Sequence, residues 1–186
     1  MGLFSFFKKN DADRKTKHTF KDKAGWHFDS AMEEYLDETG KNENELSESD
    51  LDDVWARAHG HMVYPLMWAI DVHKISDELI ESASEDIEKI KSRTLSPDMF
   101  FSEHCDEILC DYDFNDETSE FLSQFYAEYV ERFTNSIEMS STETSDAEIS
   151  TTKTQAYRPF SWDIYDEAAK PILDEMYSHW INGRPV

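Results

Sequence analysis

Residues 117–137 read ETSEFLSQFYAEYVERFTNSI, and the spacing of the large apolar side chains in this stretch decides the fold class. These side chains recur every four positions in two adjacent rows: Phe121, Phe125, Tyr129, Phe133 and Ile137, then Leu122, Tyr126 and Val130. Residues four apart lie on one side of an α-helix. The stretch therefore predicts a long helix with one apolar face, capped at its start by Asn115 or Asp116.

A second informative stretch is the apolar run at residues 62–70, MVYPLMWAI. A helix that is apolar all round is typical of a buried position, so we expect this run at the centre of the fold. The capping pattern Ser49-x-x-Asp52 predicts that a helix starts shortly before it. Gly60 and Pro65 interrupt the pattern, which predicts either a kinked continuation of that helix or a separate short one.

The rest of the chain carries further helix signals. Predicted helices begin at Asp29 or Ser30, at Ser76, at Ser96-Pro97 and at Ser161; Gly40 ends the first, and Pro171 kinks or breaks the last. We therefore expect an all-α protein, a single compact multi-helix domain with a kinked central helix. The sequence does not decide whether short strands form near residues 20–28 or 153–160.

The domain organisation follows from composition. Residues 1–23 hold seven basic and three acidic side chains, which predicts a flexible basic leader. Its apolar segment, residues 3–7, is too short to span a membrane, and we do not expect it to rest on one. Residues 24–186 form the helical domain. Within it, residues 138–156 are rich in Ser, Thr and Glu without periodicity, which predicts a flexible loop.

The charge is the most unusual property of the chain. It has 41 acidic and 18 basic residues and a net charge of −23. Since the leader is basic, the residues after it hold 11 basic and 38 acidic side chains, a net charge of −27. Such a field repels nucleic acids and anionic membranes, and attracts basic proteins or metal cations. Direct binding of nucleic acid is therefore not expected.

Two blocks of carboxylates without an intervening basic residue are predicted to be partner-binding surfaces. The first block consists of Glu43, Glu45, Glu48, Asp50, Asp52 and Asp53. The second consists of Glu103, Asp106, Glu107, Asp111, Asp113, Asp116, Glu117 and Glu120. Like charges packed together repel one another in the free protein, and a basic partner would relieve this repulsion. Solvated helix ends with acids near positive termini would give the same pattern, so the sequence leaves both interpretations open.

The sequence contains none of the common catalytic motifs that we considered. It contains no nucleophile elbow, phosphate-binding loop or dinucleotide-binding glycine pattern. Cys105 and Cys110 match neither a redox nor a zinc motif, which favours a reducing, cytoplasmic setting. His59 and His61 are two residues apart and point to different sides of a helix, so they cannot share a metal ion there. A site that combines His27, His61 and a carboxylate from elsewhere remains an alternative.

Several short motifs follow one another in an order that resembles a bacterial family of uncharacterised small domains. They are Trp-His near the start, His-x6-Trp in the apolar run, Phe-x3-Cys-Asp, and an aromatic helix. The matching positions are Trp26, His27, His61, Trp68, Phe101, Cys105 and Asp106. The likeness covers about residues 24–137 and implies an immunity or accessory protein of a bacterial toxin system.

The leading hypothesis is therefore an acidic immunity-type protein without enzymatic activity, cofactor or metal. It would bind a basic toxin, such as a nuclease, and occlude the toxin's active site. The alternative hypothesis is a metal-binding protein or metal-dependent hydrolase that uses His27, His61 and nearby carboxylates. The sequence does not specify the partner's identity, the oligomeric state or the block that docks.

Overall fold

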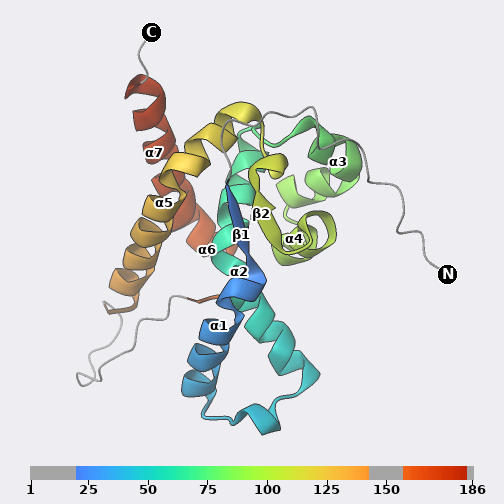
Figure 1. Cartoon of the computed structure of the whole chain (residues 1–186), viewed down its shortest axis with the longest axis vertical. Helices are drawn as coiled ribbons and strands as arrows, with labels where there is room; N and C mark the ends of the chain where they lie inside the picture. Colours follow the sequence, from blue (N-terminus) through green and yellow to red (C-terminus); the bar gives the residue numbers. More distant parts are fainter. Residues whose placement is uncertain (1–19, 143–156, 184–186) are drawn as a thin grey trace, which may run out of the picture.

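The computed structural model describes residues 20–142 and 157–183, and they form a mainly α-helical fold, as the sequence predicts (Figure 1). The α-helices are α1 (Ala24–Thr39), α2 (Glu48–Asp71), α3 (Asp77–Lys91), α4 (Pro97–Cys105), α5 (Asp116–Thr142), α6 (Trp162–Ile164) and α7 (Lys170–Gly183). Short 3₁₀ turns cover Glu43–Glu45 and Asp111–Asp113, and a π-helical turn covers Tyr165–Ala169. None of the helices in the described part of the chain combines the length and apolarity that crossing a membrane requires.

Helix α2 is the central element of the fold. Residues 58–70 of this helix are all buried, which confirms the prediction that the apolar run lies at the centre. The helix is continuous from Glu48 to Asp71, so the alternative of a separate short helix is wrong. Pro65 has no N–H, and the carbonyl of His61 loses its helical donor there. The Tyr129 hydroxyl, from α5, donates to that carbonyl in a long contact of 3.5 Å.

Gly60 does not interrupt α2 but allows another segment to pack closely against it. A Cβ atom at this position would lie 1.9 Å from the carbonyl oxygen of Arg158. The chain at residues 157–160 therefore crosses the helix almost in contact with its backbone. Glycine is required here by this close approach and not by a helix end.

The start of α2 differs from the prediction by two residues. Ser47 is the N-cap, and its hydroxyl accepts a hydrogen bond from the backbone N–H of Asp50 at 3.2 Å. The predicted cap, Ser49, lies inside the helix. Helix α1 also begins earlier than expected, at Ala24, and ends as expected at Gly40, which has a φ of 68°.

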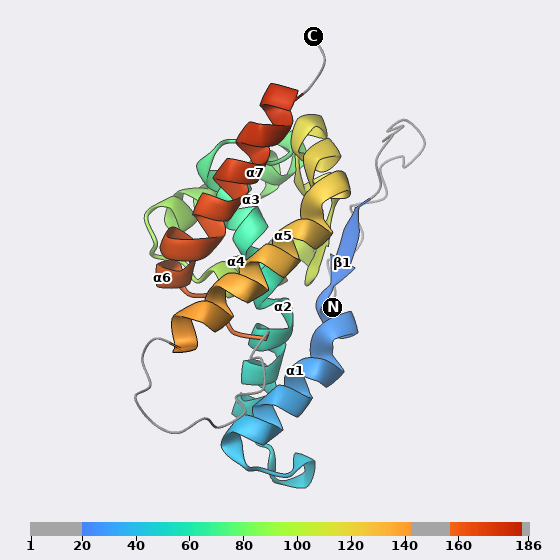
Figure 2. The same ribbon diagram turned by 90° about the vertical axis from the view of Figure 1, so that its left-hand side faces the viewer.

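The other helix starts agree with the sequence. Ser76 and Ser161 accept N-cap hydrogen bonds from Leu79 and Ile164, and Asn115 accepts one from Thr118. Ser96 and Pro97 begin α4. The predicted aromatic helix is α5, which extends to Thr142 and packs beside α7 (Figure 2).

A small antiparallel sheet joins the segment before α1 to the segment after α4. Strand β1 (Lys21–Lys23) pairs with β2 (Ile108–Cys110), with Asp22 opposite Leu109. Phe20 is buried and Lys21–Lys23 form β1. The predicted boundary of the flexible leader at residue 23 is therefore wrong, because residues 20–23 belong to the fold. Residues 1–19, and 143–156 of the predicted loop, lie outside the described residues; residues 138–142 are helical, and residues 157–160 form no strand.

Candidate functional site

The first acidic block lies on the turn between α1 and α2 and on the start of α2. This turn extends away from the other helices and forms the lower end of the molecule in Figures 1 and 2. Five exposed carboxylates form what we name the acidic tip: Glu43, Glu45, Glu48, Asp52 and Asp53. These five side chains are available to a partner in the folded protein.

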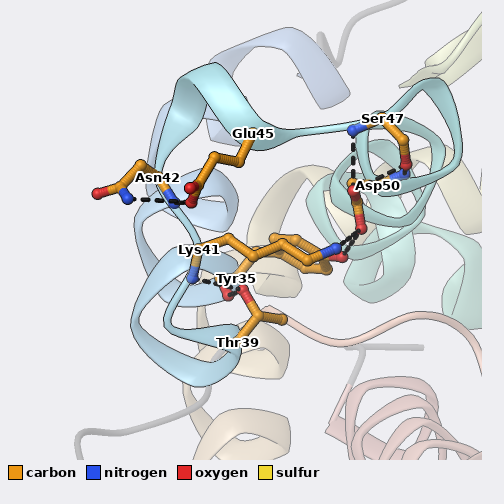
Figure 3. A network of polar contacts seen from close by, with 7 residues as sticks. All are labelled: Tyr35, Thr39, Lys41, Asn42, Glu45, Ser47 and Asp50. Atoms are coloured by element: carbon orange, nitrogen blue, oxygen red, sulfur yellow. Dashed lines mark hydrogen bonds and ion pairs between the residues drawn. The ribbon is translucent and has the colours of Figure 1, made fainter.

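Asp50, the sixth member of the block, is buried and does not belong to this surface. Its carboxylate accepts hydrogen bonds from the Tyr35 hydroxyl, the Lys41 ammonium group at 2.6 Å, and the backbone N–H and hydroxyl of Ser47, both at 2.8 Å. Figure 3 shows how these side chains converge from α1, the turn and α2. The prediction that Asp50 binds a partner is therefore wrong, because its lone pairs are used inside the turn.

The same network fixes the conformation of the tip. The pKa of Asp50 lies well below its ordinary value, mainly because of the Lys41 ammonium group and then the Tyr35 hydroxyl. At the 3₁₀ turn, the Glu45 carboxylate accepts hydrogen bonds from the backbone and side chain of Asn42, each at 3.0 Å (Figure 3). Short polar contacts thus connect both ends of the turn, so the exposed carboxylates are held on a defined backbone.

The second acidic block is not a single surface. Asp111 and Asp113 are buried, which excludes them from an exposed docking face. The Asp113 carboxylate accepts the backbone N–H of Cys110 at 2.7 Å, and burial raises its pKa to about 6. Glu117 pairs with Lys74 at 3.1 Å and Glu107 is half-buried, whereas Asp106 and Asp116 are exposed. The block thus combines structural and surface carboxylates.

The structure brings His27 and His61 together, as the alternative hypothesis anticipates. Their rings pack edge to face with centroids 4.4 Å apart. The missing carboxylate is that of Asp22 in β1. One oxygen, Oδ1, lies 2.7 Å from Nε2 of His27, and the other, Oδ2, lies 3.2 Å from Nε2 of His61. We name these three residues the Asp22–His27–His61 cluster.

Two tyrosines surround this cluster. The Tyr126 hydroxyl donates to Oδ2 of Asp22 at 2.7 Å, and the Tyr157 hydroxyl lies 3.2 Å from Nδ1 of His27. Burial alone would raise the pKa of Asp22, but the hydrogen bonds from His27, His61 and Tyr126 outweigh it and hold the pKa well below its usual range. Burial lowers the pKa of His61, which favours its neutral form at neutral pH.

His59 takes no part in this cluster, as its spacing from His61 predicts. Its Nε2 lies 3.0 Å from Oδ1 of Asp98, on another side of α2. A second group of metal-ligand side chains is formed by Asp86, Glu103 and His104. In that group Asp86 also pairs with Lys89 at 2.6 Å, and the ammonium group competes with any bound cation.

The remaining family-motif positions have different surroundings. Trp68, Phe101 and Cys105 are buried in the core, and Nε1 of Trp68 donates to Asp174 at 2.8 Å. Trp26 is 63% exposed, with the Lys23 ammonium group 5.6 Å from its ring. Of these motifs, only the two histidines are brought together as candidate ligands.

A groove of about 500 Å³ lies between α5 and α7, away from the tip and the histidine cluster. Its walls include the aromatic rings of Phe125 and Trp180 and the carboxylate of Glu128. Arg132, at its edge, pairs with Glu175 at 2.9 Å. The groove contains no residue from the predicted family-motif positions.

Comparison with known proteins places most of the chain in one family. A family model described as a domain of unknown function (DUF7832) matches residues 20–149. This confirms the predicted membership in a family of uncharacterised domains, and it extends the likeness to Asp22 at the start. No curated protein and no solved structure matches the chain.

Proposed function

The chain belongs to the DUF7832 family, whose function is unknown. We propose that it binds a positively charged protein through the acidic tip. The observation that carries this proposal is the exposure of five carboxylates on the projecting turn and the adjoining start of α2. Two further features of the structure support it.

The first supporting feature is that many of the protein's own Lys and Arg side chains already form ion pairs. Within the described residues, eight Lys and Arg side chains lie 2.6–3.1 Å from a carboxylate. At the turn, the Lys41 ammonium group pairs with buried Asp50 at 2.6 Å. A cationic partner would relieve the mutual repulsion of the exposed carboxylates and would be attracted over a distance of about 10 Å at moderate salt.

The second supporting feature is preorganisation. Binding costs free energy when a loop must be ordered, and a loop that is already ordered avoids this cost. The hydrogen bonds from Tyr35, Lys41 and Ser47 to Asp50 hold the turn in the free protein. The tip is therefore a better candidate surface than the second acidic block, from which burial removes Asp111 and Asp113.

The finer form of the proposal names the partner. The resemblance implies a toxin, and the charge favours a basic one such as a nuclease, which the protein would neutralise by covering the active site. Charge would then set the association rate, and contacts formed after docking would set the dissociation rate.

The test compares two variants of equal net charge. The tip variant carries Glu43→Gln, Glu48→Gln, Asp52→Asn and Asp53→Asn, and leaves Glu45 in its hydrogen bonds. The control carries Glu81→Gln, Glu85→Gln, Glu131→Gln and Glu167→Gln, at exposed positions on α3, α5 and the π-helical turn. Association with a candidate basic partner, for which proteins encoded beside the gene are the first choice, is measured by surface plasmon resonance at 50 and 300 mM salt.

We expect the tip variant to lose at least about tenfold in association rate at low salt and the control to lose much less. Equal losses in both variants would show a non-specific charge effect and contradict docking at the tip. Binding that is indifferent to salt and to both variants would overturn the proposal.

A further inference from the structure

We propose that Asp22, His27 and His61 together bind one divalent transition-metal ion, for which Zn²⁺ is the best-fitting candidate. This inference concerns a different part of the molecule from the acidic tip and does not depend on it. It begins with the position of the three ligand atoms. One ring nitrogen of His27, one ring nitrogen of His61 and a carboxylate oxygen of Asp22 all lie within 4.8 Å of one another.

The spacing suits a first-row metal ion. Nitrogen and oxygen ligands bind Zn²⁺ at about 2.0–2.1 Å, so neighbouring ligands in a tetrahedron are about 3.3–3.4 Å apart. The two contacts with Asp22 are 2.7 Å from Oδ1 to His27 and 3.2 Å from Oδ2 to His61. A metal ion between these groups would bind both carboxylate oxygens or turn one of them toward both imidazoles, and it would widen the shorter contact by about 0.7 Å.

The ligand types select the class of ion. Two imidazoles and one carboxylate suit Zn²⁺, Fe²⁺ and related ions, whereas Ca²⁺ and Mg²⁺ prefer oxygen ligands alone. Three protein ligands leave a coordination position for water or another small ligand. Asp22 and His61 are buried, whereas the His27 side chain is 24% exposed, so His27 provides the route from solvent.

The surrounding groups orient the ligands in the way that metal sites require. A metal on Nε2 of His27 leaves the ring proton on Nδ1, and the Tyr157 hydroxyl oxygen, 3.2 Å away, can accept it. The Tyr126 hydroxyl donates to Asp22 at 2.7 Å and fixes the carboxylate. Hydrogen bonds of this kind hold the ligands of known metal sites in position.

The position of Tyr157 is itself fixed by two neighbouring helices. Its backbone N–H donates to the Glu34 carboxylate of α1 at 3.0 Å. The next residue, Arg158, lies against the backbone of α2 at Gly60. The cluster is thus surrounded by residues from five segments of the chain: β1, α1, α2, α5 and residues 157–160. A hydrogen bond between Asp22 and His27, which are five residues apart, would form without the other three segments.

The first experiment uses full-length protein without an affinity tag. The protein is treated with a chelator, dialysed, and titrated with Zn²⁺ in a calorimeter. Metal is then measured by mass spectrometry after gel filtration. We expect about one equivalent that survives gel filtration, with a Kd well below the micromolar range. Titration with Co²⁺ should give visible absorption bands that report nitrogen and oxygen ligands.

The second experiment locates the ion with variants. His27→Gln changes a half-buried ligand, so the fold should persist, as checked by circular dichroism, and we expect affinity to fall at least 100-fold. Tyr157→Phe keeps all three ligands and should weaken binding about tenfold. The matched control is His59→Gln, which removes a buried histidine two residues from His61 on the same helix, bonded to Asp98 instead. This control should retain the full equivalent.

Two results would overturn the inference. Wild-type protein that retains less than about a tenth of an equivalent after incubation with 10 µM Zn²⁺ would show that the cluster is only a hydrogen-bonded network. Full retention of the ion by folded His27→Gln would show that the ion binds elsewhere. The tip variant described above should still bind the ion, which separates this site from weak binding by surface carboxylates.

Discussion

Ser47 is the N-cap residue of α2. Its hydroxyl accepts the backbone N–H of Asp50, and Ser49 lies two residues inside the helix. Ser47→Ala should therefore reduce the free energy of unfolding by about 1 kcal/mol, the usual value of an N-cap hydrogen bond. Ser49→Ala, the matched control, should have almost no effect. Urea denaturation of both variants measures the difference, and equal losses would contradict the assignment of the cap.

Asp113 makes stability depend on pH in a direction opposite to that of most carboxylates. Burial raises its pKa to about 6 in the folded protein, against about 3.9 in an unfolded chain. The folded state therefore favours the protonated form. The stabilising contribution is complete at pH values below the unfolded pKa and is lost as the pH rises through 6.

Replacing Asp113 by Asn removes this dependence and keeps an oxygen that can accept the N–H of Cys110. We expect the stability of Asp113→Asn relative to wild type to increase by about 1–2 kcal/mol between pH 5 and pH 7.5. Urea denaturation at both pH values measures it. A relative stability that does not change with pH would show that the carboxyl titrates normally.

At the scale of elements, the contact between α2 and residues 157–160 depends on one missing side chain. Alanine usually stabilises a helix interior over glycine by about 0.5–1 kcal/mol. At Gly60 a Cβ atom would overlap the Arg158 carbonyl, so Gly60→Ala should destabilise the protein and displace this segment. Limited proteolysis with chymotrypsin, which cleaves after tyrosine and so can report exposure of the chain at Tyr157, would measure the displacement.

The control for this prediction is Gly25→Ala in α1. Nothing lies within 4 Å of a Cβ atom at Gly25, so the substitution should stabilise the protein by about 0.5–1 kcal/mol. The opposite signs expected at the two glycines separate packing from helix propensity. If both substitutions stabilised the protein, the close approach of residues 157–160 would be wrong.

The elements that sequence reasoning predicts well are those whose own periodicity specifies them. The four-residue spacing from Phe121 to Ile137 and the apolar run before Ile70 need no knowledge of distant contacts. The start of α2 is different. Ser47-x-x-Asp50 and Ser49-x-x-Asp52 match the same capping pattern, and the choice between them is made by Tyr35 and Lys41, which bind Asp50 from outside the helix.

The candidate metal site was predictable only in part for the same reason. His27 and His61 could be paired from the sequence because both lie beside apolar segments. Asp22 could not, because it lies in a stretch with a net positive charge and enters the cluster only through the pairing of β1 with β2. A three-residue strand whose partner begins 87 residues away leaves no periodic signal in the sequence.

At the scale of the whole molecule, repulsion among unpaired carboxylates should oppose folding. The net charge of −23 concentrates like charges on a compact surface. Raising NaCl from 20 to 200 mM should therefore raise the melting temperature, because the screening length falls from about 20 Å to about 7 Å. Differential scanning fluorimetry measures the shift. The tip variant should start at a higher melting temperature and respond less, whereas a fall with salt would show that attractive ion pairs dominate.

The continuity of α2 has a mechanical consequence. Its first turn carries carboxylates of the tip, and its last turns are the most deeply packed part of the protein. A protein that binds Glu48 and Asp52 would therefore contact one end of a helix whose other end is buried in the core. Because the core holds this helix in place, we expect conformational changes on binding to occur in the partner's loops and not in α2.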